Sequence, residues 1–269
     1  MNMKLNLDSR VAIVTGGSKG IGRQISLALA AEGVKVVVAA RGLVAIEETC
    51  ILINSTGGDA LGMQVDVTSV PEVKHVVHQT LERYGKLDFL VNNAGGAIKY
   101  GSFQDCSEVD WLDSFRLNVM GCVNFVQAGE SALLISDQAR ILTISSITGI
   151  QPGYFNPHYS ITKAATINLS KHLANIYADK GVCCNVICAG PVHSDAWNQN
   201  VSALANAKSV SFDDAYAELE AQEKRKIPLG RIGEPGDIAA MVVFLLSDQA
   251  SWITGSCFHV NGGKYAAMS

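Results

Sequence analysis

The sequence predicts one α/β domain, a doubly wound parallel sheet with helices on both faces. Two observations predict it. Short apolar runs alternate with segments of helical character along all 269 residues, an order that gives parallel pairing through right-handed crossovers. The runs are continuous in Val, Ile and Leu, which is typical of strands buried on both faces. Because no linker rich in Pro, Gly or Ser divides the chain, we expect a single domain over residues 1–269.

The elements follow in order along the chain. The first predicted helix runs from Ile21 to Glu32, and Gly33 is placed to end it. A second helical segment breaks near Gly57, and a third ends at Gly85. The predicted strands are residues 11–15, 34–40, 61–67, 87–94, 139–146, 181–188 and 256–260.

Composition excludes several classes of protein. The chain is 48% hydrophobic and 17% charged, which argues against disorder. With a net charge of −4 and no long basic block, nucleic acid is not an expected partner. No apolar run approaches the roughly 18 residues that span a bilayer, and residues 1–10 do not have the pattern of a secretory signal. We therefore expect a soluble cytoplasmic protein without a membrane partner.

The seven cysteines are expected to be reduced. An odd number in a chain without a signal peptide does not indicate a disulfide framework. Cys183, Cys184 and Cys188 form the run VCCNVIC, but a metal site would need a second ligand set at finger-like spacing. We interpret them as core residues and predict no metal site.

The first strand ends in a glycine-rich turn. In VAIVTGGSKGIG, Gly16, Gly20 and Gly22 lie between a strand and a helix. Such a turn lets the backbone approach a pyrophosphate, which the N–H groups at the start of the helix attract. The sheet is therefore predicted to be Rossmann-type, with its ligand crevice beyond the carboxyl ends of the strands.

The end of the second strand indicates which dinucleotide binds. An acidic residue there would bond the ribose 2′-hydroxyl of NAD(H), but this chain has Ala40 followed by Arg41. A guanidinium suits a phosphate, and Lys19 adds a second cation. These residues favour NADP(H). The alternatives are that both cations are solvated surface residues and that the cofactor is NAD(H).

Several motifs together resemble the short-chain dehydrogenases/reductases, nearest their 3-oxoacyl-[acyl-carrier-protein] reductase-like branch. TGGSKGIG resembles that family's TGxxxGxG turn, and NNAG at residues 92–95 its fourth-strand motif. Ser146, YSITK (Tyr159 to Lys163) and Asn118 in RLNVMG resemble its catalytic tetrad. The resemblance continues through PLGRIGEPGDIA (228–239) and ITGSCFHVNGG (253–263), so it spans nearly the whole chain.

The resemblance implies that Asn118, Ser146, Tyr159 and Lys163 are catalytic. On a helix Tyr159 and Lys163 share one face. The ammonium favours the phenolate, which makes Tyr159 a usable acid/base near neutral pH. Lys163 would also bond the nicotinamide ribose, Ser146 would hold the substrate oxygen, and Asn118 would anchor a water leading from Lys163 towards solvent.

The resemblance also implies a set of cofactor contacts. One departure lies among them, since the family's Pro-Gly is replaced here by Ala189-Gly190-Pro191. Asp66 would contact the adenine, or it is instead a residue of the turn that starts the third helix. The implied set is Gly16, Ser18, Lys19, Gly20, Ile21, Gly22, Arg41, Asp66, Val67, Asn93, Ala94, Gly95, Tyr159, Lys163, Gly190, Val192 and Ser194.

Within the single domain, residues 1–150 are expected mainly to bind the dinucleotide. Residues 151–269 would supply the catalytic helix, a substrate lid at about 193–226 and the last strand. Substrate contacts are expected from residues 96–103, 148–158 and 193–221. Tyr154, Phe155 and Trp197 either line a pocket, pack the lid or form oligomer contacts. Family members commonly assemble, so a homo-oligomer, either a tetramer or a dimer, is expected.

The function predicted from these residues is NADP(H)-dependent hydride transfer between nicotinamide and a small-molecule ketone or secondary alcohol, as a carbonyl reductase. Two alternatives stay open. One is an NAD-dependent alcohol dehydrogenase, and the other a nucleotide-binding regulator without catalysis. The sequence does not name the substrate.

Overall fold

The computed structural model describes residues 4–267 and has the predicted architecture. Its seven strands form one parallel sheet in the order β3-β2-β1-β4-β5-β6-β7. The strands are β1 (Val11–Thr15), β2 (Lys35–Ala40), β3 (Ala60–Gln64), β4 (Phe89–Asn92), β5 (Arg140–Ser146), β6 (Cys183–Ala189) and β7 (Cys257–Val260). The order reverses between β1 and β4, so the crevice beyond their carboxyl ends is the topological switch point of the sheet.

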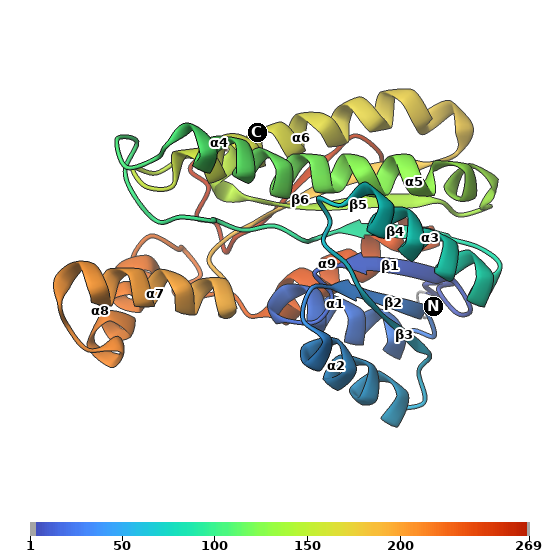
Figure 1. The fold of residues 1–269 in the computed structure, drawn as a ribbon, viewed down its shortest axis with the longest axis horizontal. Coiled ribbons are helices and arrows are strands. Elements are labelled where there is room, and N and C mark those ends of the chain that lie inside the picture. Colours follow the sequence, from blue (N-terminus) through green and yellow to red (C-terminus); the bar gives the residue numbers. More distant parts are fainter. Residues whose placement is uncertain (1–3, 268–269) are drawn as a thin grey trace.

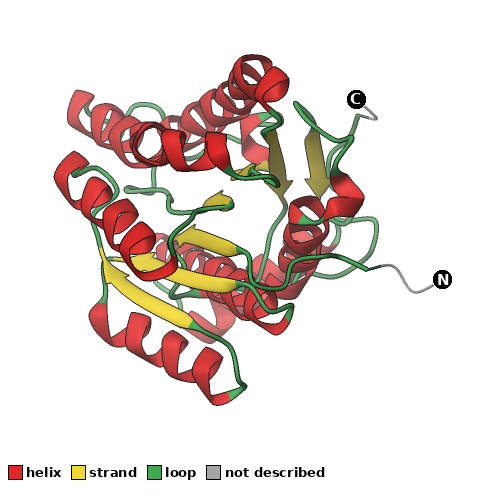
Figure 2. Ribbon diagram, turned by 90° about the vertical axis from the view of Figure 1, so that its right-hand side faces the viewer, coloured by secondary structure: helices red, strands yellow, loops and turns green. Residues whose placement is uncertain are grey.

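Helices cover both faces of the sheet (Figures 1 and 2). They are α1 (Gly20–Ala31), α2 (Leu43–Ser55), α3 (Val70–Tyr84), α4 (Glu108–Phe115), α5 (Gly121–Ile135), α6 (Pro157–Tyr177), α7 (Asp195–Lys208), α8 (Phe212–Lys224) and α9 (Pro235–Leu246). Helices α1, α2 and α9 lie on one face, and α3, α5 and α6 on the other (Figure 1). A separate buried apolar cluster fills each side, one around Ile25 and Val242, the other around Phe125 and Leu173.

Most strand bounds differ from the predicted ones by one to three residues, and residues 11–15 agree with β1. The strand predicted at 61–67 shows the cause of such differences. Regular pairing of β3 ends at Gln64, because the carboxylate of Asp66 accepts hydrogen bonds from the N–H and hydroxyl of Thr68, which turn the chain towards α3.

The segment expected as a lid at 193–226 folds as α7 and α8. These helices form a hairpin that projects from one end of the molecule (Figure 1). It has a small apolar core of its own, which includes Trp197, Val201, Ala215 and Ile227. The hairpin is therefore a compact unit and not an open loop.

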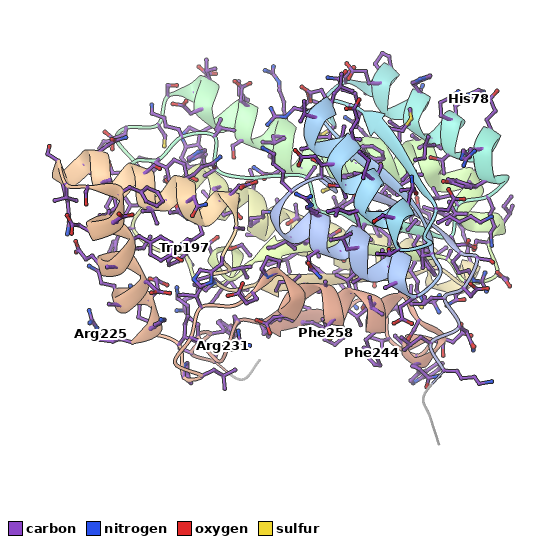
Figure 3. The ribbon with its side chains drawn as sticks, turned by 90° about the horizontal axis from the view of Figure 1, so that it is seen from below. His78, Trp197, Arg225, Arg231, Phe244 and Phe258 are labelled. Atoms are coloured by element: carbon purple, nitrogen blue, oxygen red, sulfur yellow. The ribbon has the colours of Figure 1, made fainter. Side chains whose placement is uncertain are left out.

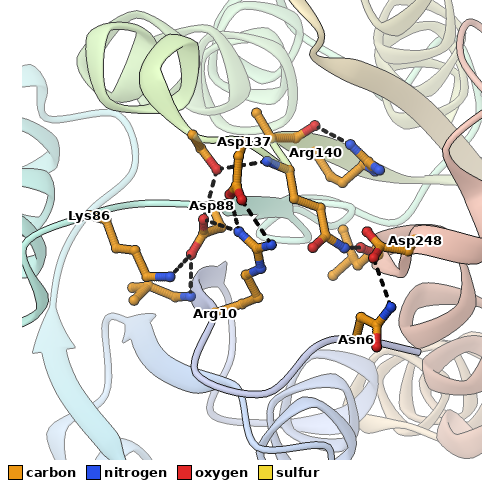
Figure 4. A network of polar contacts seen from close by, with 12 residues as sticks. Asn6, Arg10, Lys86, Asp88, Asp137, Arg140 and Asp248 are labelled. Atoms are coloured by element: carbon orange, nitrogen blue, oxygen red, sulfur yellow. Dashed lines mark hydrogen bonds and ion pairs between the residues drawn. The ribbon is translucent and has the colours of Figure 1, made fainter. Parts of the chain in front are cut away.

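The opposite end of the sheet is held by ion pairs. Asp88, immediately before β4, is 1% exposed and accepts a hydrogen bond from the Val11 N–H at 2.9 Å. Its carboxylate also pairs with Arg10 at 3.2 Å and Lys86 at 3.1 Å, and it accepts a hydrogen bond from the Ser136 hydroxyl at 2.7 Å (Figure 4). This network ties the amino ends of β1, β4 and β5 together. Over residues 4–267, none of the helices is both long and apolar enough to cross a membrane.

Candidate active site

The glycine turn after β1 is shaped to receive an anion. Gly16 has a φ of +64°, in the left-handed region that disfavours other residues. At Gly22 a Cβ atom would lie 2.1 Å from the Gly16 carbonyl oxygen, so only glycine lets α1 start so close to the turn. No side chain caps the first turn of α1, and no acidic residue lies in it. Its N–H groups and dipole therefore remain available to a pyrophosphate.

Asn93 fastens this turn to the end of β4. Its side-chain amide donates to the carbonyl oxygens of Thr15 at 2.9 Å and Gly16 at 3.2 Å. The Thr15 hydroxyl in turn accepts the backbone N–H groups of Asn93 and Ala94, both at 2.9 Å. The motif NNAG thus sets the width of the crevice at the switch point.

Two cations face the solvent on the cofactor side of the crevice. Lys19 lies in the glycine turn, Arg41 follows β2, and both side chains are exposed. Neither has an ion-pair partner within the described ranges of the chain. The pKa of Asp66 is held below its usual range, first by the Thr68 N–H and also by the charge of Arg41, so these groups lie near each other. The turn, the uncapped helix and the unpaired cations fit a dinucleotide with an extra phosphate.

Asp66 is a residue of the turn that leads into α3, one of the two roles that its position in the sequence suggested. Its carboxylate accepts two hydrogen bonds from Thr68, and its N–H donates to the Glu72 carboxylate at 2.8 Å. It therefore forms the turn at the start of α3. Val67, the next residue, is buried, and its carbonyl accepts the Asn124 amide at 2.9 Å.

Asn118 lies where the helical pattern changes. Residues Arg116–Met120 form one π-helical turn between α4 and α5, a local distortion common at functional sites. The buried Asn118 amide donates to the Ser114 and Gly96 carbonyls at 3.0 and 3.1 Å, while its oxygen accepts the Gly96 N–H at 2.9 Å. A Cβ atom on Gly95 would lie 2.5 Å from that oxygen and 3.4 Å from the Lys163 ammonium, which places all three groups together.

Tyr159 and Lys163 come from the first turns of α6, which Pro157 begins. The Lys163 side chain is 5% exposed, and its ammonium lies 5.6 Å from the centre of the Tyr159 ring. It donates to the Ile144 carbonyl at 2.9 Å, and no carboxylate in residues 4–267 neutralises it. Tyr159 itself is half-buried. A buried, unneutralised cation beneath a phenol is an arrangement that moves protons.

Ser146 ends β5 at the same edge of the sheet. Its hydroxyl oxygen accepts the Thr148 N–H at 3.2 Å and the Thr148 hydroxyl at 3.0 Å. This fixes the position of the oxygen and leaves its own hydrogen free to donate to a substrate oxygen.

The loop after β6 closes the crevice from the other side. Gly190 donates to the Val260 carbonyl at 2.9 Å, and Gly233 exchanges backbone bonds with Pro191 and His193. These backbone hydrogen bonds fix the loop at the position where Ala189 replaces the family's first proline. The Ser194 hydroxyl donates to the Val192 carbonyl at 3.1 Å and accepts the Trp197 N–H as the N-cap of α7. A Cβ atom on Gly20 would lie 3.3 Å from the Ser194 Cβ, so the two loops meet.

The aromatic residues at the mouth separate into two groups. Trp197 is buried and packs edge-on against His193 and Tyr216, at ring distances of 5.8 and 6.2 Å, so it is part of the hairpin's packing. With Arg225 and Arg231 it lies at the hairpin end of the molecule (Figure 3). Tyr154 and Phe155 instead stand exposed on the loop before α6.

The structure shows further residues around the candidate site that local sequence patterns did not reveal. The Tyr100 hydroxyl donates to the Gln199 side chain on α7 at 3.3 Å, a link from the loop after β4 to the hairpin. Burial raises the pKa of Tyr100, and the phenol of Tyr159 adds to this shift, so the two rings are neighbours. Ser145 donates to the Lys163 carbonyl at 2.9 Å and so fixes α6 on β5. Tyr100 lies inside a segment expected to contact substrate, but its partner is 99 residues away.

Comparison with known proteins gives matches over nearly the whole chain. The family model described as enoyl-(acyl carrier protein) reductase matches residues 16–264. The chain is 36% identical over 260 residues to the 3-oxoacyl-[acyl-carrier-protein] reductase FabG of Staphylococcus aureus, covering 96% of this chain and 98% of that protein. It is 33% identical over 264 residues to FabG of Escherichia coli, covering 97% and 99%.

Solved structures match equally completely. An L-sorbose reductase from Gluconobacter frateurii, complexed with NADPH and L-sorbose, superposes with a TM-score of 0.92 at 28% identity, covering 99% of this chain and 100% of that one. A short-chain type dehydrogenase/reductase from Mycobacterium marinum has a TM-score of 0.87 at 28% identity, covering 98% of each chain.

Proposed function

Because the chain belongs to the short-chain dehydrogenase/reductase family, we propose that it reduces a small ketone to a secondary alcohol with NADPH. The observation that carries the proposal is the buried, unneutralised Lys163 ammonium beneath Tyr159, at the edge of the sheet where the glycine turn lies. That charge is costly to bury, and an acid/base role for the adjacent phenol would account for it.

The preference for NADPH rests on charge. Lys19 and Arg41 offer two unpaired cations beyond β1 and β2, and Ala40 stands where a carboxylate would repel a 2′-phosphate. A guanidinium binds a phosphate with fork-like donors and permanent charge. The reductase from Gluconobacter frateurii that shares this fold was solved with NADPH, which supports the same choice here. When bound, the cofactor supplies the hydride.

The residues of this chain would position the substrate and move the proton. Ser146 donates its hydroxyl hydrogen to the substrate oxygen, and the Tyr159 phenol gives its proton to that oxygen as negative charge develops there. The Lys163 ammonium stabilises the phenolate that remains. Asn118 holds the turn beside Lys163 through Gly96 and would anchor the water that returns a proton from solvent.

Substrate choice is assigned to the mouth of the crevice. We assign residues 1–150 mainly to the dinucleotide, and residues 193–226 to a lid that closes on the substrate. The Tyr100–Gln199 hydrogen bond joins that hairpin to the loop after β4 beside Tyr159. A cytoplasmic homo-oligomer, either a tetramer or a dimer, completes the proposal.

The test is loss of NADPH absorbance with a panel of ketones, from β-ketoacyl thioesters to ketoses. Turnover with at least one class, and a lower kcat/KM with NADH, is the expected result. Comparable efficiency with NADH would remove the cofactor assignment, and NADPH binding without turnover of any ketone would favour the regulator.

Replacing Tyr159 by Phe tests the acid/base assignment. The variant is expected to bind NADPH normally and to lose at least about a hundredfold in kcat, the lower range for a general acid. Tyr84→Phe is the matched control, because the hydroxyl of Tyr84, at the end of α3, donates to Asp59 outside the proposed site, and its loss should leave kcat unchanged. Near-normal turnover by Tyr159→Phe would refute the assignment.

A further inference from the structure

Three ligand-type side chains meet at the end of β6 and β7, outside the catalytic tetrad. They are Cys188, Cys257 and His259, and their donor atoms all lie within 4.8 Å of one another. The two sulfur atoms are 3.2 Å apart, and both cysteines are free thiols. The mechanism above uses none of the three.

The pairing of the strands brings them together. Cys188 stands opposite His259, and Val186 opposite Cys257, in the parallel register of β6 and β7. Side chains two residues apart on a strand share a face, so all three project from the same side of the sheet. Ser145, the register partner of Cys188 on β5, donates to the Lys163 carbonyl, so this is the side that α6 covers. Sixty-nine residues separate the two cysteines in sequence, which is why no local spacing indicates the cluster.

We propose that Cys188, Cys257 and His259 form a binding site for a thiophilic divalent cation such as Zn²⁺. Tetrahedral zinc bound by two thiolates and an imidazole holds its donor atoms about 3.5–3.8 Å apart, from bond lengths of about 2.3 Å to sulfur and about 2.0 Å to nitrogen. That separation lies between the 3.2 Å sulfur contact and the 4.8 Å limit of the cluster. A disulfide would need the sulfurs to close to about 2.05 Å, whereas the metal site needs them to open by only about 0.5 Å.

The surroundings suit three protein ligands and one open position. Cys188 is buried, Cys257 is half-buried and His259 is exposed, so the cluster opens towards solvent on the histidine side. The His259 ring is stacked on Tyr265, with centroids 4.7 Å apart and planes 21° apart, which restrains its orientation. On binding, each thiol releases its proton to solvent, and the two thiolates balance the charge of the cation.

A cation bound at this site would stabilise the loop that follows β6. Cys188 lies two residues before Gly190, which begins the loop held against Val260 at the end of β7. A metal that joins β6 to β7 there would tie together the two strands that carry this loop. The inference does not depend on which cofactor or substrate the enzyme uses.

The experiment titrates reduced, metal-free full-length protein with Co²⁺ as a spectroscopic probe and then displaces it with Zn²⁺. One Co²⁺ per chain, with a thiolate-to-metal charge-transfer band, is expected, together with a rise in Tm on Zn²⁺ addition. Cys257→Ser and His259→Gln should each weaken Co²⁺ binding at least about tenfold. Mutating a residue that only hydrogen-bonds to a metal ligand already lowers metal affinity by about that factor. Cys183→Ser is the matched control, because that half-buried thiol stands at an odd spacing from Cys188 on β6 and so projects from the opposite face.

Three outcomes would overturn the proposal. One is the absence of a charge-transfer band in reduced protein whose Tm shows that it is folded. Another is Co²⁺ binding that survives both Cys257→Ser and His259→Gln, which would place the metal elsewhere. A Cys188–Cys257 disulfide in air-exposed protein, combined with no metal binding after reduction, would identify a redox pair and reject the metal site.

Discussion

Lys163 shows how a single residue links packing to chemistry. Its side chain is buried, and its ammonium donates to the Ile144 backbone carbonyl, while no carboxylate between residues 4 and 267 pairs with it. The carbonyl of Ile144 orients the ammonium, which lies 5.6 Å from the centre of the Tyr159 ring. Ser145 and Thr166 hold the backbone of Lys163 from β5 and α6.

Arg41 carries a prediction at the same scale. Arg41→Ala is expected to lower kcat/KM with NADPH by about ten- to a hundredfold, because a charge-assisted contact to a phosphate is worth about 1.5–3 kcal/mol. Efficiency with NADH, which has no 2′-phosphate, should change little. Steady-state kinetics with both cofactors checks this.

Arg83→Ala is a matched control for Arg41. It removes another exposed guanidinium, which pairs with Asp59 just before the amino end of β3, and it should leave both cofactors unaffected. An equal loss with NADPH and NADH in Arg41→Ala would mean that the residue acts through folding and not through the phosphate.

At the scale of elements, the α7–α8 hairpin is anchored where it returns to the body. Asp237 in the first turn of α9 pairs with both terminal nitrogens of Arg231, at 2.7 and 2.8 Å. It also accepts the Glu234 N–H at 2.7 Å in a capping box. On the other side, His193 lies between the carboxylates of Glu234 and Glu220, at 2.7 and 3.4 Å. These contacts fix the hairpin at its base, and the Tyr100–Gln199 hydrogen bond adds a link to the loop after β4.

The Asp237 pair gives a pH-dependent prediction. The Arg231 guanidinium holds the pKa of Asp237 below its usual range. Such a group stabilises the fold above its unfolded pKa of about 3.9, and this contribution is lost as the pH falls through the lower folded value. Asp237→Asn is therefore expected to lower Tm at neutral pH, and its difference from the natural chain should shrink below about pH 4.

Thermal unfolding followed across that pH range makes the comparison. Asp179→Asn serves as the control, since this carboxylate is exposed at the end of α6 and should show little difference at any pH. A Tm difference for Asp237→Asn that stays constant down to acid pH would reject the ionic contribution.

For the whole molecule, the two ends of the sheet have divided roles. The carboxyl ends of the strands hold the glycine turn, the side chains that we propose to be catalytic and the loop after β6. The amino ends hold the Asp88 network, which joins segments around Val11, Lys86 and Ser136 (Figure 4). Stability at one end and chemistry at the other can therefore be altered separately.

Asp88→Ala tests this division. The variant leaves the buried Val11 N–H without its acceptor, which costs about 1–3 kcal/mol, so the free energy of unfolding should fall by at least that amount while Kd for NADPH stays unchanged. Denaturant unfolding and cofactor titration measure the two quantities. Asp137→Asn provides the contrast, because its 81% exposed carboxylate pairs with the same Arg10 and a surface pair contributes about 0–1 kcal/mol. Equal losses for both variants would contradict the model of a buried anchor.

The local patterns of the sequence predicted a large part of this molecule. The continuous apolar runs predicted the parallel sheet, and each glycine turn or helix stop lies where the chain itself requires one, as Gly85 does with its φ of +75° at the end of α3. The spacing of Tyr159 and Lys163 was readable because a helix fixes which residues share a face. Strand ends were less predictable, since Asp66 and Thr68 end β3 through their own side chains.

By itself, then, the sequence determined the α/β architecture, the glycine turn and the tyrosine–lysine pair, because each depends on neighbours within a few residues. Only the tertiary structure decided which distant side chains meet. Tyr100 reaches Gln199, and Cys188 meets Cys257 and His259, through loop packing and strand register. Register is set by the packing of the whole sheet against its helices, and no local spacing in the chain records it.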